Sequence, residues 1–159
     1  CVASGNTSYD QIEIRCRKGR ILKYFLDTNI CIYLINQKSE KLQAKFNSQN
    51  VNQFAVSSVS VGELEYGIAK SKFPEKNQLA LLEFLSQLEI ISFTEQDSVP
   101  FGRIRAYLHS KGTPIGPYDL QIAAQCLSRG FTLVTNNVKE FERIPDLMIE
   151  NWVEESLIA

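Results

Sequence analysis

Short apolar segments alternate with helical patterns along most of this chain. Apolar runs without polar alternation, typical of strands buried on both faces, cover residues 21–26, 54–57, 89–93, 132–135 and, less clearly, 148–151. Helical patterns extend from the first strand through Ile35 and cover 39–46, 59–70, 74–88, 96–110 and 117–129. Strands separated by helices pair in parallel. The sequence therefore predicts an α/β fold in three layers, with a short, mainly parallel sheet flanked by helices.

A chain of 159 residues suggests one domain, and residues 1–20 differ from the rest. They are polar, show no period and end in a basic run, so we expect a flexible N-terminal extension outside a domain covering 21–155. They contain no apolar core of a secretory signal peptide. No apolar run approaches the roughly 20 residues of a membrane span. These features predict a cytoplasmic protein with no membrane segment.

Four polar side chains stand where strands end or helices begin: Asp27, Glu63, Asp119 and Asn137. In parallel sheets, ligands bind beyond the carboxyl ends of the strands. We therefore expect these four side chains to converge at one edge of the sheet.

Two of these acids occupy positions where a helix normally places apolar residues. The positions three, four and seven residues after Asp27 are all apolar, and the same is true of Asp119. Such positions share one helix face, so both carboxylates begin a stripe that points into the core. Ionised carboxylates are rarely buried without a partner. A shared cation would provide one.

Each of these residues also has a purely structural interpretation. Asp27 could cap the first helix, and Glu63 could complete a capping box with Ser60. Asp119 could stabilise the positive end of a helix dipole, and Asn137 could be a turn residue. The structural interpretation weakens for the set, because clustered carboxylates repel one another unless a cation neutralises them. Glu65 remains an alternative to Glu63, because both flank an apolar position.

The available ligands indicate which cation would bind. The chain has a single histidine, His109, and its four cysteines are scattered, which argues against zinc. Oxygen ligands alone select a hard cation, Mg²⁺ or Mn²⁺. Such a site suits hydrolysis of a phosphodiester bond. The net charge of −1 shows no overall basic character, so a polyanion would bind through a local patch or through metal ions.

Four ordered motifs resemble those of the PIN-domain ribonucleases, and most closely the VapC toxins of bacterial toxin–antitoxin pairs. The resemblance runs from about Ile21 to Trp152 and rests on residues 25–29, 58–67, 116–119 with 122–123, and 134–137 with 140–141. Each motif alone is weak, whereas the ordered set is quite specific.

The resemblance implies roles for individual residues. Asp27, Glu63 and Asp119 would form the acidic metal-binding and catalytic triad, which selects Glu63 over Glu65. Thr28 would support the first acid. Asn137 stands where many relatives carry a fourth acid, which makes a second tightly bound metal doubtful. Glu140 could substitute for that acid, although a surface helix charge is the better interpretation.

The resemblance also implies an activity and partners. It predicts an Mg²⁺-dependent endoribonuclease, with Mn²⁺ as a substitute, acting as a toxin that cleaves cellular RNA, often tRNA, and stops translation. A homodimer and a VapB-type antitoxin partner are expected, in the bacterial cytoplasm. Candidate RNA contacts are Arg103, Arg105, Lys111, Lys139 and Arg143, all equally explained as solvated charges on helix faces.

Two rival functions use the same residues. One is a catalytically silent PIN-like module that binds RNA or protein, and the missing fourth acid is its only support. The other is a phosphatase with an aspartyl nucleophile. Asn29 occupies the position where such an enzyme needs a second Asp, which disfavours it.

Overall fold

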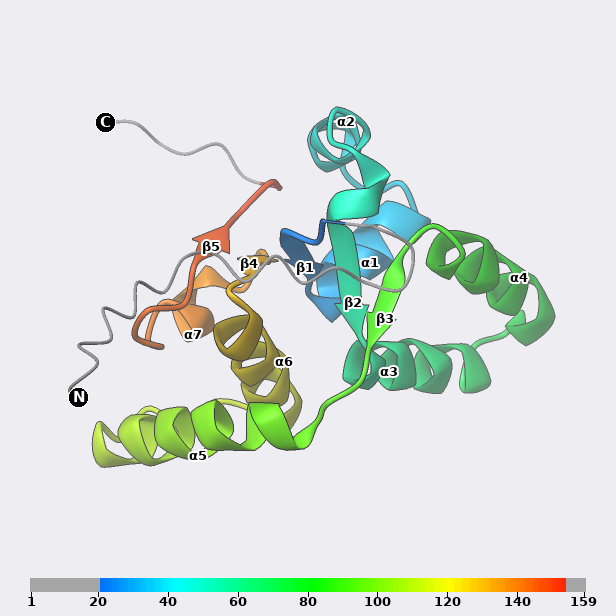
Figure 1. The fold of residues 1–159 in the computed structure, drawn as a ribbon. Helices are drawn as coiled ribbons and strands as arrows, with labels where there is room; N and C mark the ends of the chain where they lie inside the picture. The colour runs from blue at the N-terminus through cyan, green and yellow to red at the C-terminus, as the bar shows by residue number, and fades with distance from the viewer. Residues whose placement is uncertain (1–20, 154–159) are drawn as a thin grey trace, which may run out of the picture.

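Within residues 21–153, which the computed structural model describes, five parallel strands form one sheet (Figure 1). Their order across the sheet is β3-β2-β1-β4-β5. The strands are β1 (Tyr24–Leu26), β2 (Phe54–Ser57), β3 (Glu89–Ile91), β4 (Thr132–Val134) and β5 (Ile149–Glu150). Leu26 is in register with Val56 on one side and Val134 on the other. The residues that directly follow the three central strands therefore meet at one edge.

Helices cover both faces of this sheet. They are α1 (Thr28–Ile35), α2 (Glu40–Asn47), α3 (Ser58–Ala69), α4 (Pro74–Leu85), α5 (Glu95–Ser110), α6 (Pro117–Arg129) and α7 (Val138–Phe141). Figure 1 shows α1 to α4 on one side and α5 to α7 on the other. The predicted three-layer α/β architecture is confirmed.

The alternation of side chains along the strands divides the core in two. Phe25 and Leu133 pack with α5 and α6, whereas Leu26 and Val56 pack with α1 to α4. Successive strand residues point to opposite faces, and here both faces are apolar because both are covered. This explains why the strands appear in the sequence as continuous apolar runs.

Most predicted elements are confirmed, with shifts at their ends. The first strand begins at Tyr24 rather than Ile21, and α4 ends at Leu85 rather than near residue 88. The sequence did not predict the short helix α7 or a 3₁₀ turn over Val51–Gln53. Segments this short contain too few residues to show a helical period. The predicted extension at residues 1–20, like residues 154–155, lies outside the described residues.

None of the helices in the described part combines the length and the apolarity needed to cross a membrane. Cys31 and Cys126 are buried and free, as expected for small core residues. Burial raises the pKa of both thiols, so they remain protonated and unreactive.

A buried amide ties the sheet to α6. The Ser57 hydroxyl donates to Gln125 Oε1 at 2.5 Å, and Gln125 Nε2 donates to the Ile91 carbonyl at 3.1 Å. Ser57 Oγ also accepts from the Val59 N–H at 3.0 Å, which caps α3. The side chain of Gln125 thus connects β2, β3 and the start of α3.

We expect Gln125→Ala to lower the free energy of unfolding by about 2–4 kcal/mol, because it leaves a cavity and two buried polar groups without partners. Urea denaturation measures this. Gln96→Ala is the control, since Gln96 is exposed and should change stability by less than about 0.5 kcal/mol. A similar loss in both variants would show that the buried amide contributes nothing special.

Candidate active site

Asp27 follows β1 directly and is held rigidly at the edge of the sheet. Its backbone N–H donates to the Val134 carbonyl at 3.0 Å. Its Oδ1 accepts from the Thr28 N–H and its Oδ2 from the Thr135 hydroxyl, both at 2.8 Å. Asp27 is also the N-cap of α1, so the capping interpretation is correct, but it does not explain the burial of this residue. The carboxylate is only 3% exposed, a degree of burial that a helix cap does not require.

Thr28 connects α1 to α3. Its hydroxyl lies 2.9 Å from Glu63 Oε1 and 3.0 Å from Ser60 Oγ. A hydroxyl has one proton and a carboxylate only accepts, so Thr28 donates to Glu63 and accepts from Ser60. Glu63 forms no capping box with Ser60, because the N-cap of α3 is Ser57. The capping-box interpretation is wrong. The Glu63 carboxylate instead contacts the hydroxyl of Thr28, the residue after Asp27.

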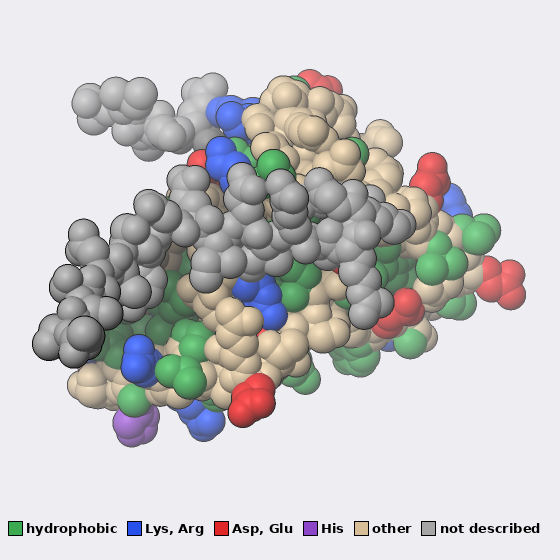
Figure 2. All heavy atoms as spheres, in the orientation of Figure 1, with side chains coloured by type: hydrophobic (Ala, Val, Ile, Leu, Met, Phe, Trp, Pro, Cys, Tyr) green, Lys and Arg blue, Asp and Glu red, His purple; other side chains and the backbone are tan. Residues whose placement is uncertain are grey.

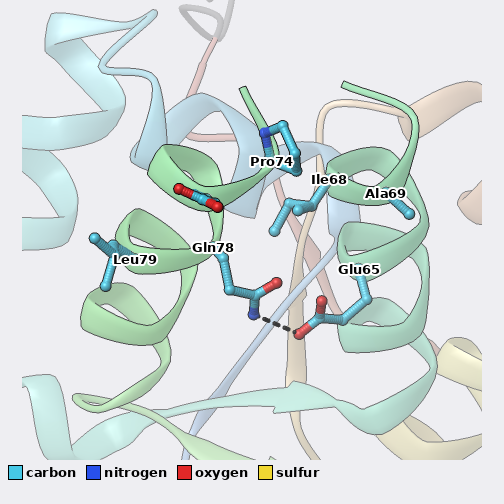
Figure 3. A pocket seen from close by; sticks show the side chains of 7 residues that line it. Glu65, Ile68, Ala69, Pro74, Gln78 and Leu79 are labelled. Atoms are coloured by element: carbon cyan, nitrogen blue, oxygen red, sulfur yellow. Dashed lines mark hydrogen bonds between the residues drawn. The ribbon is translucent and has the colours of Figure 1, made fainter. Parts of the chain in front are cut away.

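The structure separates Glu63 from Glu65. Glu65 accepts from Gln78 Nε2 at 3.0 Å and faces a different pocket, between α3 and α4 (Figure 3). Two residues along a helix correspond to a rotation of about 200°, so the two side chains leave opposite sides of α3. The neighbouring acid is therefore excluded from the pocket that Glu63 lines.

Asp119 lies in the first turn of α6, after Pro117 at the helix start. In this position its charge can stabilise the positive end of the helix dipole, as one interpretation expected, but its surroundings are strongly acidic. Burial, followed by the charges of Asp27, Glu140 and Glu63, raises the pKa of Asp119 to about 7. Burial likewise raises the pKa of Asp27, despite its two hydrogen bonds. These carboxyl groups converge on one place and disfavour one another's charge.

The acids open onto one pocket of about 980 Å³. α3 packs against α6 and α1 beside it, so three different helices contribute to the wall. The residues lining it are Asp27, Thr28, Asn29, Ile32, Val59, Gly62, Glu63, Tyr66, Gly67, Lys70, Tyr118, Asp119, Gln121 and Asn137. All five predicted site residues, the three acids with Thr28 and Asn137, are in this set.

Asn137 occupies the fourth position of the site, and Glu140 lies on the short helix α7 that follows it. Asn137 lines the pocket, and its N–H donates to Thr135 Oγ1 at 3.0 Å. Glu140, one turn further on, is half-buried, and its charge is among those that raise the pKa of Asp119. Glu140 is a helix charge, as expected, and it is not among the residues that line the pocket. Thr135 was not predicted as a site residue, although it stands directly after β4, where a site residue is expected.

The donor set fits a hard divalent cation. Among residues 21–153, no three Asp, Glu, His or Cys side chains are placed to hold a metal ion by themselves. Mg²⁺ does not need such a cage, because it is usually bound by one or two carboxylates together with water and substrate phosphate. Asp27, Glu63 and Asp119 supply oxygen atoms only, and their mutual repulsion favours a cation among them.

Figure 2 shows one face of the molecule, on which the basic side chains left in view lie at several separate places. The basic residues proposed from the sequence as RNA contacts are absent from the pocket lining, where the described residues include one basic side chain, Lys70.

We expect Asp119→Asn to stabilise the metal-free protein at pH 8. A carboxyl with a raised folded-state pKa adds stability below its unfolded pKa and loses it as pH rises through the folded value of about 7. After discounting for the partial exposure of this side chain, the gain is about 1–2 kcal/mol. It should disappear near pH 4, roughly the unfolded pKa of Asp.

Thermal unfolding in EDTA at both pH values measures this effect. Asp146→Asn is the matched control, because Asp146 is exposed and its φ of 65° suits Asn equally well. A lower melting temperature for Asp119→Asn at pH 8 would contradict the electrostatic account.

Comparison with known proteins gives a consistent result. The family model described as PIN domain matches residues 24–147. The chain is 46% identical over 132 residues to the tRNA(fMet)-specific endonuclease VapC of Salmonella typhimurium, covering 83% of this chain and 99% of that protein. It is 47% identical over 131 residues to ribonuclease VapC2 of Rickettsia felis, covering 81% and 97%.

Solved structures agree. VapBC2 from Rickettsia felis, bound to a promoter DNA fragment, matches with a TM-score of 0.77 and 44% identity, covering 82% of this chain and 99% of that chain. DNA-bound VapBC from Salmonella typhimurium matches with a TM-score of 0.78 and 46% identity, covering 82% and 98%. With its fold, its acidic pocket and these relatives, the chain belongs to the PIN-domain family and, within it, to the VapC ribonucleases.

Proposed function

We propose that Asp27, Glu63 and Asp119 hold a divalent metal, Mg²⁺ with Mn²⁺ as a substitute, for hydrolysis of phosphodiester bonds in RNA. The observation that carries this proposal is the convergence of three carboxylates, one directly after β1, one within α3 and one in the first turn of α6, on one open pocket. The raised pKa values of Asp27 and Asp119 mark a site where the protein concentrates negative charge. A cation relieves that charge.

A metal held by these carboxylates would supply positive charge to polarise the scissile phosphate. The protein supplies position. Hydrogen bonds from the Thr28 N–H and the Thr135 hydroxyl hold both oxygens of Asp27, and the Thr28 hydroxyl holds Glu63. Asn137, at the same pocket, offers an amide that can donate to a phosphate oxygen without adding negative charge. Such fixed geometry lowers the barrier because little reorganisation is left for the reaction.

The substrate and partners follow from the relatives' names. The Salmonella relative is named as a tRNA(fMet)-specific endonuclease, which supports tRNA as the substrate class here. The VapBC structures support a VapB-type antitoxin partner. We further propose a toxin that inhibits translation as a homodimer in the bacterial cytoplasm, with residues 21–155 as its nuclease domain and residues 1–20 as an extension.

The function is tested by incubating purified protein with total tRNA in Mg²⁺, in Mn²⁺ and in EDTA, and mapping new 5′ ends. Cleavage should require the metal. Glu63→Gln should reduce the rate by about 10²-fold, as expected for losing one electrostatic contact. Glu65→Gln is the matched control, two residues away on the same helix and in the other pocket, and should cleave normally.

Equal activity in Glu63→Gln and Glu65→Gln would refute the assignment of Glu63. A folded protein that neither cleaves RNA nor binds Mn²⁺ in a calorimetric titration would instead be the catalytically silent module.

A further inference from the structure

Two exposed tyrosines stand at the acidic pocket. Tyr66 is 67% exposed and Tyr118 is 56% exposed, and both line the pocket that contains Asp27, Glu63 and Asp119. Together with Lys70, which also lines it, we call them the tyrosine rim. Neither exposed ring contributes to the two core clusters of the fold. Their shared position at the pocket therefore calls for a role outside folding.

The backbone ties each tyrosine to an acid. Tyr66 follows Glu63 by three residues on α3, which places both on one face of that helix. Tyr118 directly precedes Asp119 in the first turn of α6. α3 packs against α6, so the two rings stand beside the carboxylates on adjacent helices. A ligand that reaches the acids is therefore in position to contact the rings as well.

Lys70 adds a positive charge to this rim. Its Nζ lies 4.7 Å from the centre of the Tyr66 ring, a cation–π distance. It is the single basic side chain among the described residues that line the pocket. An ammonium group at the wall of an acidic pocket can bind a phosphate of an RNA strand that reaches the acids.

Two glycines keep the wall between the acids and the rim open. Gly62 and Gly67 line the pocket, and a Cβ added to either would meet no atom within 4 Å. Because these two residues have no side chain beyond a hydrogen atom, the surface of α3 beside Glu63 and Tyr66 is open. A flat group can therefore approach the helix closely.

We propose that the tyrosine rim binds unpaired RNA bases next to the cleaved bond, with bases stacked on Tyr66 and Tyr118 and Lys70 at a neighbouring phosphate. This inference rests on the proposed function and specifies the form of RNA that the pocket accepts. Aromatic faces bind any unstacked base, whereas bases inside a duplex are already stacked on one another. The rim therefore selects single-stranded RNA, such as a loop.

The test measures RNA affinity in the Asp27→Asn background, which keeps the RNA intact. The probes are a labelled RNA single strand of about ten nucleotides and the duplex of the same sequence. Fluorescence anisotropy of the label measures the binding of each probe. Tyr66→Ala and Tyr118→Ala should each weaken single-strand binding by about tenfold, which corresponds to about 1.4 kcal/mol, and leave duplex affinity unchanged. Tyr66→Phe, which retains the ring, should bind within about twofold of its parent. Lys70→Gln should reduce the salt dependence of log Kd by about 0.7.

The chain contains a matched control for the tyrosine–lysine pair. Tyr107 and Lys111 on and just after α5 have the same spacing, with Lys111 Nζ 5.6 Å from the ring centre, but neither lines the pocket. Tyr107→Ala should not change RNA affinity. Single-strand affinity that is unchanged in both rim variants, or lost equally for single strand and duplex, would overturn the proposal. Cleavage by the unmodified protein is measured separately, so failure of the rim is distinguishable from failure of the nuclease function.

Discussion

Asp27→Asn is expected to lower the rate of RNA cleavage by about 10³-fold or more while the protein stays folded. Asp27 is the most buried of the three acids, and both of its oxygens are oriented by hydrogen bonds. The amide removes the negative charge that would attract the cation, with almost no change of shape. Folding is retained because burial already disfavours the charged form of Asp27, as its raised pKa indicates.

Initial rates on tRNA in Mg²⁺ measure the loss, and circular dichroism with thermal unfolding verifies the fold. Calorimetric titration with Mn²⁺ should show weakened binding in the same variant. Asp146→Asn, the exposed Asp-to-Asn change, should retain full activity and metal affinity. Full nuclease activity in Asp27→Asn would remove this carboxylate from the mechanism.

Asp97→Ala is expected to lower the free energy of unfolding by about 3–5 kcal/mol without involving the active site. Asp97 is fully buried and accepts from the Thr94 N–H at 2.7 Å, which caps α5. It also pairs with Arg129 and accepts from Ser128, both at the end of α6. The side chain of Arg129 is itself 8% exposed, so removing Asp97 leaves a guanidinium without its partner in a poorly hydrated place.

The pH dependence of this effect has a definite sign. Burial alone would raise the pKa of Asp97, but the hydrogen bonds from Arg129, Ser128 and the Thr94 N–H outweigh it and lower the pKa. A carboxyl with a lowered pKa stabilises the fold above its unfolded value, roughly 3.9, and loses that effect as pH falls through the folded value. The difference between the two proteins should therefore be largest near pH 7 and shrink below about pH 4.

Urea denaturation at several pH values tests this. Glu95→Ala is the control, since Glu95 is exposed in the first turn of the same helix and should contribute less than about 1 kcal/mol. A loss in Asp97→Ala no greater than in Glu95→Ala would show that the ion pair adds nothing beyond a surface charge.

Local sequence patterns predicted most of the fold, because the longer helices show a helical period and the central strands are short apolar runs. The apolar runs at β1, β2 and β4 are continuous since helices cover both faces, and Gly130 closes α6 with a φ of 68°. The helix α7 could not be predicted from the sequence, because its four residues are too few to show a helical period. Because α7 was not predicted, the position of Glu140 on it could not be predicted either.

The sequence by itself determined the class of fold, the family resemblance and two acids, Asp27 and Asp119, whose positions in apolar stripes required explanation. Those facts depend on neighbours along the chain. From the sequence, the family resemblance alone selected Glu63 over Glu65, and the tertiary structure gives the physical reason, with Glu63 at the pocket and Glu65 away from it. Only the tertiary structure brought the charge of Glu140 to bear on Asp119 and set two tyrosines at the rim of the pocket. Such relations join residues that are distant in sequence, and they depend on how helices rotate and pack across the sheet. Periodicity along one helix contains no information about that packing.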